Sequence, residues 1–226
     1  MTDIRKMLSV YFIAGSQDCR HLAQPPADAL LSILEQALKC GISCFQFREK
    51  GEYSLQDPQK IRQLAEQCRD LCHHYQVPFV VNDDVDLALS LQADGIHVGQ
   101  EDRPIQQMIE QCQDKLFLGL SINTLQQAID NRTSHIIFNK IDYFGVGPIF
   151  ATQSKVDAKS TVGLDLIRQI RQQGIDKPLV AIGGISAETA LAIRQTGADG
   201  VAVISAITQS NNIASTIQQL KGLSIT

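Results

Sequence analysis

Short apolar runs alternate along the chain with longer segments in which apolar residues recur every three or four positions. The short runs are rich in β-branched residues and apolar on both faces, which is typical of strands buried in a parallel sheet. The longer segments have the spacing of amphipathic helices. Eight strands are predicted, at residues 8–14, 43–47, 79–82, 95–99, 117–122, 143–147, 179–182 and 200–204.

A helix is predicted after each strand. The predicted helices are 27–39, one within 54–74, 85–91, 105–112, one capped by Thr124 and running to 129, 164–173, 187–196 and 213–220. The alternation predicts an α/β fold, a (β/α)8 TIM barrel. The alternative is an open doubly wound sheet, but no Gly-x-Gly-x-x-Gly turn follows the first strand.

Length and composition indicate one globular unit. We expect residues 1–226 to form a single (β/α)8 barrel domain, since barrels of about this length are common. The net charge of −4 does not indicate a basic surface for binding nucleic acid. No apolar run approaches the ~20 residues that span a bilayer, and residues 1–7 make a poor signal peptide. We therefore expect a cytoplasmic protein that binds neither nucleic acid nor membrane, and a homo-oligomer is compatible with the sequence.

Six cysteines are spread along the chain without metal-site spacing. No Cys-x-x-Cys pair is present, and no histidine completes a zinc site. We expect buried or partly buried free thiols, because free cysteine is commonly a core residue.

Two acids follow two neighbouring strands. Asp83 comes just after the third predicted strand and Asp102 shortly after the fourth. In a parallel α/β fold these strand ends lie side by side on the face where ligands bind. The two carboxylates could share a cation or divide acid and base roles. The alternative is that each only caps the next helix.

The second strand carries an unusual polar face. Gln46, Arg48 and Lys50 alternate with Phe45 and Phe47, so a period of two places the three polar residues together. Barrel interiors usually hold branched apolar residues, so this strand is expected to send an amide and two cations toward the barrel mouth. The alternative is a strand end with Lys50 in water.

The last strands and the long loop 148–161 have features of phosphate sites. Gly183 and Gly184 follow the seventh strand, where barrels commonly bind phosphate and where glycine lets the backbone approach an anion. The long loop offers two hydroxyls and a cation, Thr152, Ser154 and Lys155. Two anion sites are therefore predicted. One is neutral and suits a monophosphate, and the other combines cations with acids and suits a magnesium diphosphate.

Nearly the whole chain resembles the thiamine-phosphate synthase family of (β/α)8 enzymes. The resemblance rests on an ordered set of motifs. They are QFREK at 46–50, ND at 82–83, ADGIHVGQ at 93–100 with Asp102, GLS at 119–121, DYFGVGP at 142–148, TQSK at 152–155, GL at 163–164, AIGGI at 181–185 and ISAI at 204–207.

The resemblance implies an enzyme that joins 4-amino-2-methyl-5-hydroxymethylpyrimidine diphosphate to 4-methyl-5-(2-phosphoethyl)thiazole, or its carboxylated form. Its products would be thiamine phosphate and diphosphate. The implied pyrimidine diphosphate contacts are Gln46, Arg48, Lys50, Asn82, Ser121 and Lys155. The implied thiazole phosphate contacts are Thr152, Gln153, Ser154, Gly184, Ile204 and Ser205. Asp83 and Asp102 would hold one Mg²⁺ per subunit, and Arg48, Lys50 and Lys155 would be catalytic.

Three positions depart from the family pattern. Ser154 stands where the family often has Thr, Asn123 where it usually has His, and Gln127 where a Glu is often found. The first keeps its hydroxyl, and a structural role is expected for Gln127. The Asn bears on the nearest alternative, a thiazole tautomerase, which would place its catalytic His there.

The aminopyrimidine can stabilise a cation at its exocyclic methylene, so a dissociative mechanism without a protein nucleophile is expected. Catalysis would then consist of stabilising the charge of the leaving diphosphate and positioning the two rings. A further alternative is a sensor that binds thiamine phosphates without catalysis.

Overall fold

The computed structural model describes residues 3–100, 105–112, 115–152 and 160–222. Eight parallel strands pair in chain order, and β8 pairs with β1 to close a barrel. The predicted TIM barrel is therefore confirmed. The strands are β1 Val10–Ala14, β2 Cys44–Phe47, β3 Phe79–Asn82, β4 Gly95–Val98, β5 Phe117–Ile122, β6 Tyr143–Val146, β7 Leu179–Ile182 and β8 Gly200–Val203.

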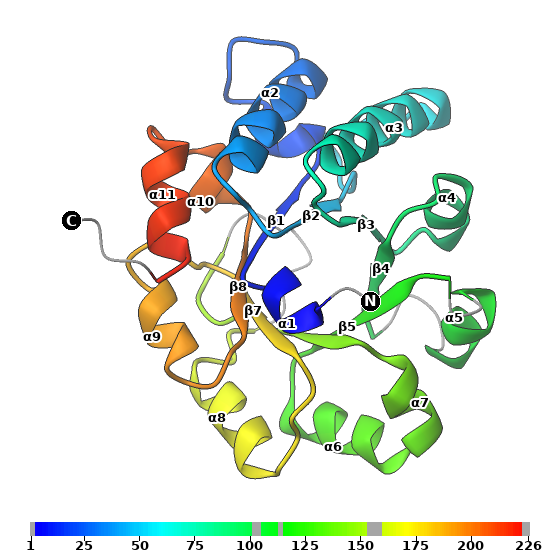
Figure 1. The fold of residues 1–226 in the computed structure, drawn as a ribbon, viewed down its shortest axis with the longest axis vertical. Coiled ribbons are helices and arrows are strands. Elements are labelled where there is room, and N and C mark those ends of the chain that lie inside the picture. The colour runs from blue at the N-terminus through cyan, green and yellow to red at the C-terminus, as the bar shows by residue number, and fades with distance from the viewer. Residues whose placement is uncertain (1–2, 101–104, 113–114, 153–159, 223–226) are drawn as a thin grey trace.

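The helices form a ring around the barrel, as Figure 1 shows. They are α2 Pro26–Lys39, α3 Pro58–His74, α4 Val85–Ser90, α5 Ile105–Cys112, α6 Leu125–Thr133, α7 His135–Lys140, α8 Asp165–Gln172, α9 Ala190–Arg194, α10 Ser205–Thr208 and α11 Ile213–Leu220. Two further short elements flank β1, namely α1 Ile4–Met7 and the 3-10 helix η1 Ser16–Cys19.

The strand pleat separates two apolar cores. Phe45 and Phe47 belong to the larger core between the barrel and its helices. Cys44 belongs to a smaller core inside the barrel. Gln46 also lies inside, where its amide bonds to Tyr11. The predicted alternation along the second strand is confirmed, because successive side chains point to opposite faces of the sheet.

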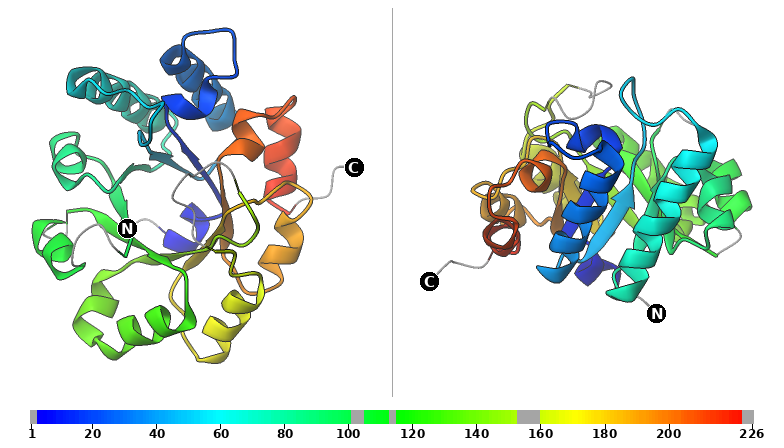
Figure 2. Two further views of the ribbon diagram at one scale, coloured as in Figure 1. Left: turned by 180° about the vertical axis from the view of Figure 1, so that it is seen from behind. Right: turned by 90° about the horizontal axis from the view of Figure 1, so that it is seen from above.

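Helix α1 lies across one end of the barrel. It precedes β1, whereas η1 follows β1, so the two lie at opposite ends, as the side view in Figure 2 shows. Met7 and Leu8 pack into the core inside the barrel. Arg5 pairs with Asp199 at 2.5 Å and with Asp176 at 3.0 Å. The amino end of the barrel is thereby closed by apolar packing and an ionic rim.

The sequence pattern missed four short elements, α1, η1, α7 and α10, which have four to six residues each. Such segments are too short to display a helical repeat. The helix predicted within 54–74 is α3, Pro58–His74. That helix begins at Pro58, with the Asp57 carboxylate accepting from the Gln59 N–H at 2.9 Å.

The six cysteines are free, and five of them are buried. Burial raises the pKa of the Cys68 thiol well above its ordinary value, so the thiol stays protonated. Across the described parts of the chain, no helix has the length and apolar character required to cross a membrane.

Candidate active site

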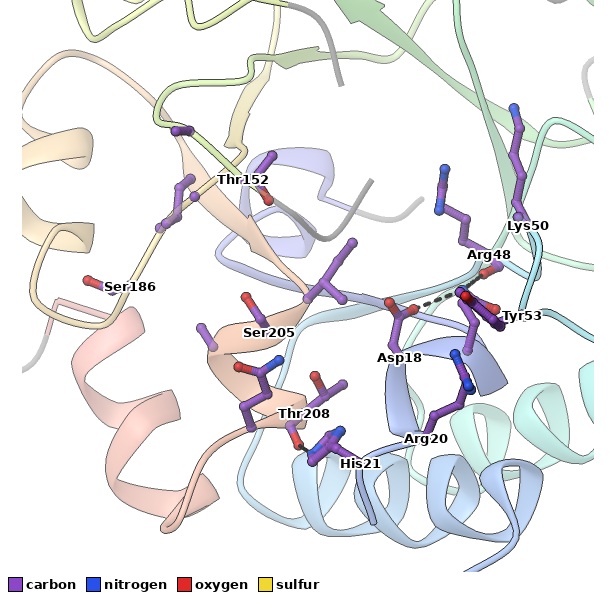
Figure 3. A pocket seen from close by; sticks show the side chains of 18 of the residues that line it. Asp18, Arg20, His21, Arg48, Lys50, Tyr53, Thr152, Ser186, Ser205 and Thr208 are labelled. Carbon is purple, nitrogen blue, oxygen red and sulfur yellow. Dashed lines mark hydrogen bonds between the residues drawn. The ribbon is translucent and has the colours of Figure 1, made fainter. Parts of the chain in front are cut away.

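A cavity of about 1160 Å³ opens at the carboxyl ends of the strands. It is large enough for a substrate of small-molecule size. Loops that follow β1, β2, β6, β7 and β8 line it (Figure 3). Of the predicted site residues, the lining includes Arg48, Lys50, Thr152, Gly184, Ile204 and Ser205.

The end of β2 supplies two cations to this cavity. Arg48 is 6% exposed, and Lys50 lies further out on the rim. Glu49, between them, accepts hydrogen bonds from the Ser16 hydroxyl at 2.5 Å and from the Leu55 N–H at 2.7 Å. The alternation therefore sends the two cations to the cavity, while the carboxylate between them ties η1 to the loop after β2.

Lys50 is paired with an acid on the next strand. Its ammonium donates to Asp83 Oδ2 at 2.9 Å, and the Asn82 amide donates to the same oxygen at 2.7 Å. Asp83 has a φ of 62°, a left-handed conformation that Asp and Asn tolerate better than most residues. The predicted grouping of Lys50, Asn82 and Asp83 at one place on the rim is confirmed as geometry.

The alternative role for Asp83, a helix cap, is wrong. The cap of α4 is Asp84, whose carboxylate accepts from the Leu87 N–H at 2.9 Å. Asp83 lies one residue before the cap and turns its carboxylate to Lys50 instead. Asp84 had no predicted role, and the structure gives it a structural one.

Gln46 and Ser121 are both held by polar groups inside the barrel. The Gln46 amide donates to the Tyr11 hydroxyl at 2.8 Å. The Ser121 hydroxyl lies 3.0 Å from His97 Nε2. Neither residue belongs to the lining of the cavity, so they occupy the layer inside the barrel beside its mouth.

Four of the six predicted thiazole phosphate contacts, Thr152, Gly184, Ile204 and Ser205, line the same cavity. Figure 3 shows Thr152 and Ser205 across from Arg48 and Lys50. Ser205 begins α10, in the place where barrels often have a short extra helix beside a phosphate.

Gly183 and Gly184 have positive φ values of 98° and 62°. A β-carbon at Gly184 would come within 2.8 Å of Phe150 Cβ. The Phe150 N–H donates to the Gly183 carbonyl at 3.0 Å. These glycines therefore let the loop after β6 pack onto the end of β7, which brings Thr152 to the cavity.

Some predictions fall on parts of the chain that the structure does not describe. Asp102, Gln153, Ser154 and Lys155 lie outside the described residues. Within the described ranges, no group of three or more His, Cys, Asp or Glu side chains gathers as a metal site.

The sequence pattern missed the contribution of η1 to this cavity. Gln17, Asp18, Arg20 and His21 all line it. Burial raises the pKa of Asp18 to about 6, against the opposing effects of the Gly15 N–H and Arg48. The signal was present, since these polar residues follow β1 directly and the loops after barrel strands meet at one face.

The residues that depart from the family pattern at 123 and 127 both form hydrogen bonds with backbone groups. The Asn123 amide donates to the Gly147 carbonyl. Gln127 Oε1 accepts from the Asn123 N–H at 2.7 Å and the Thr124 N–H at 3.2 Å. Thr124 in turn caps α6, as predicted. The structural role expected for Gln127 is that of the reciprocal acceptor in a capping box.

Comparison with known proteins gives the same family for nearly the whole chain. A family model described as thiamine monophosphate synthase matches residues 10–207. The thiamine-phosphate synthase of Mannheimia succiniciproducens is 60% identical over 221 residues, covering 97% of this chain and 99% of that protein. The thiamine-phosphate synthase of Pasteurella multocida is 56% identical, covering 98% of this chain and 99% of that protein.

A solved structure agrees with these sequence matches. The thiamine phosphate pyrophosphorylase of Pyrococcus furiosus superposes with a TM-score of 0.79 at 30% identity, over 97% of this chain and 96% of that one. The fold, the family model and the full-length relatives therefore agree. The chain belongs to the thiamine-phosphate synthase family, transferases that make thiamine phosphate in thiamine biosynthesis.

Proposed function

We propose that this enzyme joins 4-amino-2-methyl-5-hydroxymethylpyrimidine diphosphate to 4-methyl-5-(2-phosphoethyl)thiazole, or its carboxylate, with release of diphosphate. The observation that carries this proposal is the composition of the cavity. Two cations from β2, Arg48 and Lys50, share it with Thr152 and Ser205. One cavity thus offers a strongly charged region for a diphosphate and a neutral region of hydroxyls for a monophosphate.

The pyrimidine diphosphate is assigned to the side of β2, β3 and β5. Arg48 and Lys50 would meet its phosphate oxygens, with Lys155 of the loop after β6 as a third cation. Gln46, Asn82 and Ser121 would contact the rest of the molecule. The burial of Arg48 supports this assignment, because a guanidinium with little access to water gains from a matching anion.

One Mg²⁺ per subunit is assigned to Asp83 and Asp102. The donor chemistry fits, because Asp83 offers a hard carboxylate oxygen and Mg²⁺ is commonly held by one or two carboxylates together with substrate phosphates. In the structure Lys50 neutralises this carboxylate at 2.9 Å. Asp83 therefore already sits where a cation is favoured. A bound Mg²⁺ would supply charge neutralisation for the leaving diphosphate.

The thiazole phosphate is assigned to Thr152, Gln153, Ser154, Gly184, Ile204 and Ser205. Support comes from the loop geometry, since the end of β7 holds the loop after β6 beside the start of α10. Hydroxyl and backbone N–H groups suit a phosphate that is bound but does not react.

The proposed reaction is dissociative. The carbon–oxygen bond to diphosphate breaks first, and its electron pair leaves with the diphosphate. The aminopyrimidine ring stabilises the resulting methylene cation, and the thiazole nitrogen lone pair then forms the new carbon–nitrogen bond. Arg48, Lys50 and Lys155 stabilise the charge of the leaving group, and the cavity walls align the rings. No protein nucleophile is required.

The test is to mix the two substrates with the full chain, with and without Mg²⁺, and to assay both products. Thiamine phosphate and diphosphate should appear in equal amounts, and only when Mg²⁺ is present. Binding of thiamine phosphate without diphosphate release would instead support a sensor. Interconversion of thiazole carboxylate tautomers without use of the diphosphate would support a tautomerase.

A further inference from the structure

A chain of polar side chains crosses the interior of the barrel from β5 to β2. Ser121 Oγ lies 3.0 Å from His97 Nε2, and His97 Nδ1 lies 3.1 Å from the Tyr143 hydroxyl. The Tyr143 and Tyr11 hydroxyls are 2.9 Å apart. Gln46 Nε2 completes the chain by donating to the Tyr11 hydroxyl at 2.8 Å. Its two ends are residues assigned above to the pyrimidine diphosphate, while the three residues between them have no assigned role.

The sheet is built to hold this chain. In the strand register Gly119 lies opposite both His97 and Tyr143. A β-carbon at Gly119 would overlap the Tyr143 ring and come within 2.5 Å of His97 Nδ1. A β-carbon at Gly145 would come within 2.9 Å of His97 Cε1. Two glycines on β5 and β6 thus make the space that the imidazole and the phenol occupy.

One consistent direction runs through these hydrogen bonds. The Gln46 amide nitrogen can only donate, so the Tyr11 oxygen accepts from it, and we assign the Tyr11 proton to the bond with Tyr143. Tyr143 then donates to His97 Nδ1. Burial raises the pKa of both phenols well above their ordinary value, so each keeps the proton that it must donate.

The direction continues through the imidazole. A neutral histidine whose Nδ1 accepts a hydrogen bond carries its proton on Nε2. His97 Nε2 therefore donates to Ser121 Oγ, which leaves the Ser121 proton for an acceptor outside this series of hydrogen bonds. At the other end one Gln46 N–H bonds to Tyr11, which fixes the orientation of the amide and makes its oxygen the acceptor that it can offer a substrate.

We propose that Tyr11, Tyr143 and His97 are positioning residues that hold Gln46 as an acceptor and Ser121 as a donor toward the pyrimidine diphosphate. This inference rests on the proposed function. It adds a specificity device, because an amide oxygen held at this position accepts from an exocyclic amino group and opposes a carbonyl at the same ring position. This series of hydrogen bonds thereby selects an aminopyrimidine over its oxo analogue.

The test is the Tyr143→Phe variant with two substrates, the 4-amino pyrimidine diphosphate and the analogue with a 4-oxo group. The change removes one buried hydroxyl and keeps the ring, so Gln46 becomes able to turn its amide. The ratio of kcat/KM for the amino substrate to kcat/KM for the oxo substrate should fall about tenfold, which is what one lost hydrogen bond of ordinary strength produces. An unchanged ratio, with both substrates slowed equally, would overturn the proposal.

Tyr75→Phe is the matched control. The Tyr75 hydroxyl donates to Glu35 at 3.4 Å, between two helices outside the barrel. Its loss should leave both rates unchanged, and an equal fall of the ratio in this variant would also overturn the proposal. If the wild-type chain makes no thiamine phosphate, the proposed function fails, and that outcome is separate from a wild-type enzyme whose substrate ratio resists Tyr143→Phe.

A second measurement needs no active variant. The ¹⁵N spectrum of the wild-type imidazoles, assigned with His97→Asn, should show Nδ1 of His97 unprotonated and Nε2 protonated at pH 8. The opposite tautomer would mean that the hydrogen bonds from Gln46 to Ser121 run in the reverse direction. That result would overturn the proposal even if Tyr143→Phe failed to fold.

Discussion

Two neighbouring aspartates with the same chemistry have different roles because of one backbone angle. Asp83 has a φ of 62° and turns its carboxylate to Lys50, whereas Asp84 has an extended φ of −89° and caps α4. A substitution that removes only the charge therefore separates binding from folding at this pair. Asn suits both positions, since it tolerates the left-handed region and is a good helix cap.

We expect Asp83→Asn to raise the Mg²⁺ concentration for half-maximal activity about tenfold or more, because an amide oxygen binds a hard cation less strongly than a carboxylate. Calorimetric titration with Mg²⁺ in the presence of inorganic diphosphate measures the same loss without turnover. Asp84→Asn is the control and should leave Mg²⁺ dependence and stability unchanged. An unaltered Mg²⁺ requirement in Asp83→Asn would remove this residue from the metal site.

Asp18 introduces a pH dependence into stability. Burial raises its pKa from 3.8 to about 6, so the folded chain holds a proton that the unfolded chain releases at lower pH. The free energy of unfolding therefore loses a contribution as the pH rises between these values, and that loss is complete above the folded pKa. A shift of this size corresponds to about 3 kcal/mol at most.

Asp18→Asn should remove this contribution while keeping an oxygen to accept from the Gly15 N–H, which the carboxylate bonds at 2.9 Å. The stability of the variant relative to the wild type should thus increase from pH 4 to pH 7, by up to about 3 kcal/mol. Urea denaturation at unit pH intervals measures the difference. A difference that stays constant with pH would place the titration elsewhere.

For single residues, the sequence indicates which residue types share a face of a strand, but not the backbone angles that decide the role of each residue. Gln46, Arg48 and Lys50 were predicted from a period of two, which the pleat imposes on any strand. The division of labour between Asp83 and Asp84 could not be predicted, because a left-handed Asp leaves no mark in a hydrophobic pattern.

Among the elements, α6 shows how a helix start supports the site. Two residues separate it from β5, and its capping box joins Thr124 and Gln127. Gln127 also accepts from the Asn123 N–H, so one amide oxygen satisfies two backbone donors in the turn that follows Ser121.

Gln127→Ala should lower the free energy of unfolding by about 1 kcal/mol, because it leaves those donors without their acceptor. Urea denaturation measures the change. Gln127→Glu keeps an acceptor at the same position and adds a favourable charge to the first turn, so it should retain the wild-type stability. Equal losses in both variants would show that the oxygen is not the important group.

The strands and the longer helices were predictable, while the shortest helices were not. The boundaries of β3, β5, β7, α5 and α11 match the predicted ranges. Helices α1 and α10 are four residues each and are stabilised by tertiary packing, such as that of Met7 inside the barrel, rather than by a repeat visible in sequence.

Across the whole molecule, folding and chemistry are assigned to opposite ends of the barrel. The cavity lies at the carboxyl ends of the strands, and α1 closes the amino ends. The sequence predicted the barrel and therefore the face of the site, because parallel strands bring all their carboxyl ends together. It could not predict the closure of the other end, since Arg5 and Asp199 are 194 residues apart.

Met7→Ala should lower the free energy of unfolding by about 2–4 kcal/mol, because it leaves a cavity in a buried core at the closed end. At temperatures where the variant stays folded, kcat/KM should equal that of the wild type. Thermal denaturation and initial rates measure the two effects. Leu191→Ala is the control at an exposed apolar position and should change neither quantity. A fall in kcat/KM for Met7→Ala would show that the two ends are coupled.

The space left by Gly119 and Gly145 has a consequence for how this enzyme tolerates mutation. In a library that samples substitutions at every position, substitutions of Gly119 and Gly145 should be depleted as strongly as substitutions of the substrate contacts. Neither glycine has a side chain that could touch a substrate. A map of the substitutions that the enzyme tolerates would therefore show positions that must leave space as well as positions that contact substrate. The most restrictive residues inside the barrel would include two whose contribution is the absence of a methyl group.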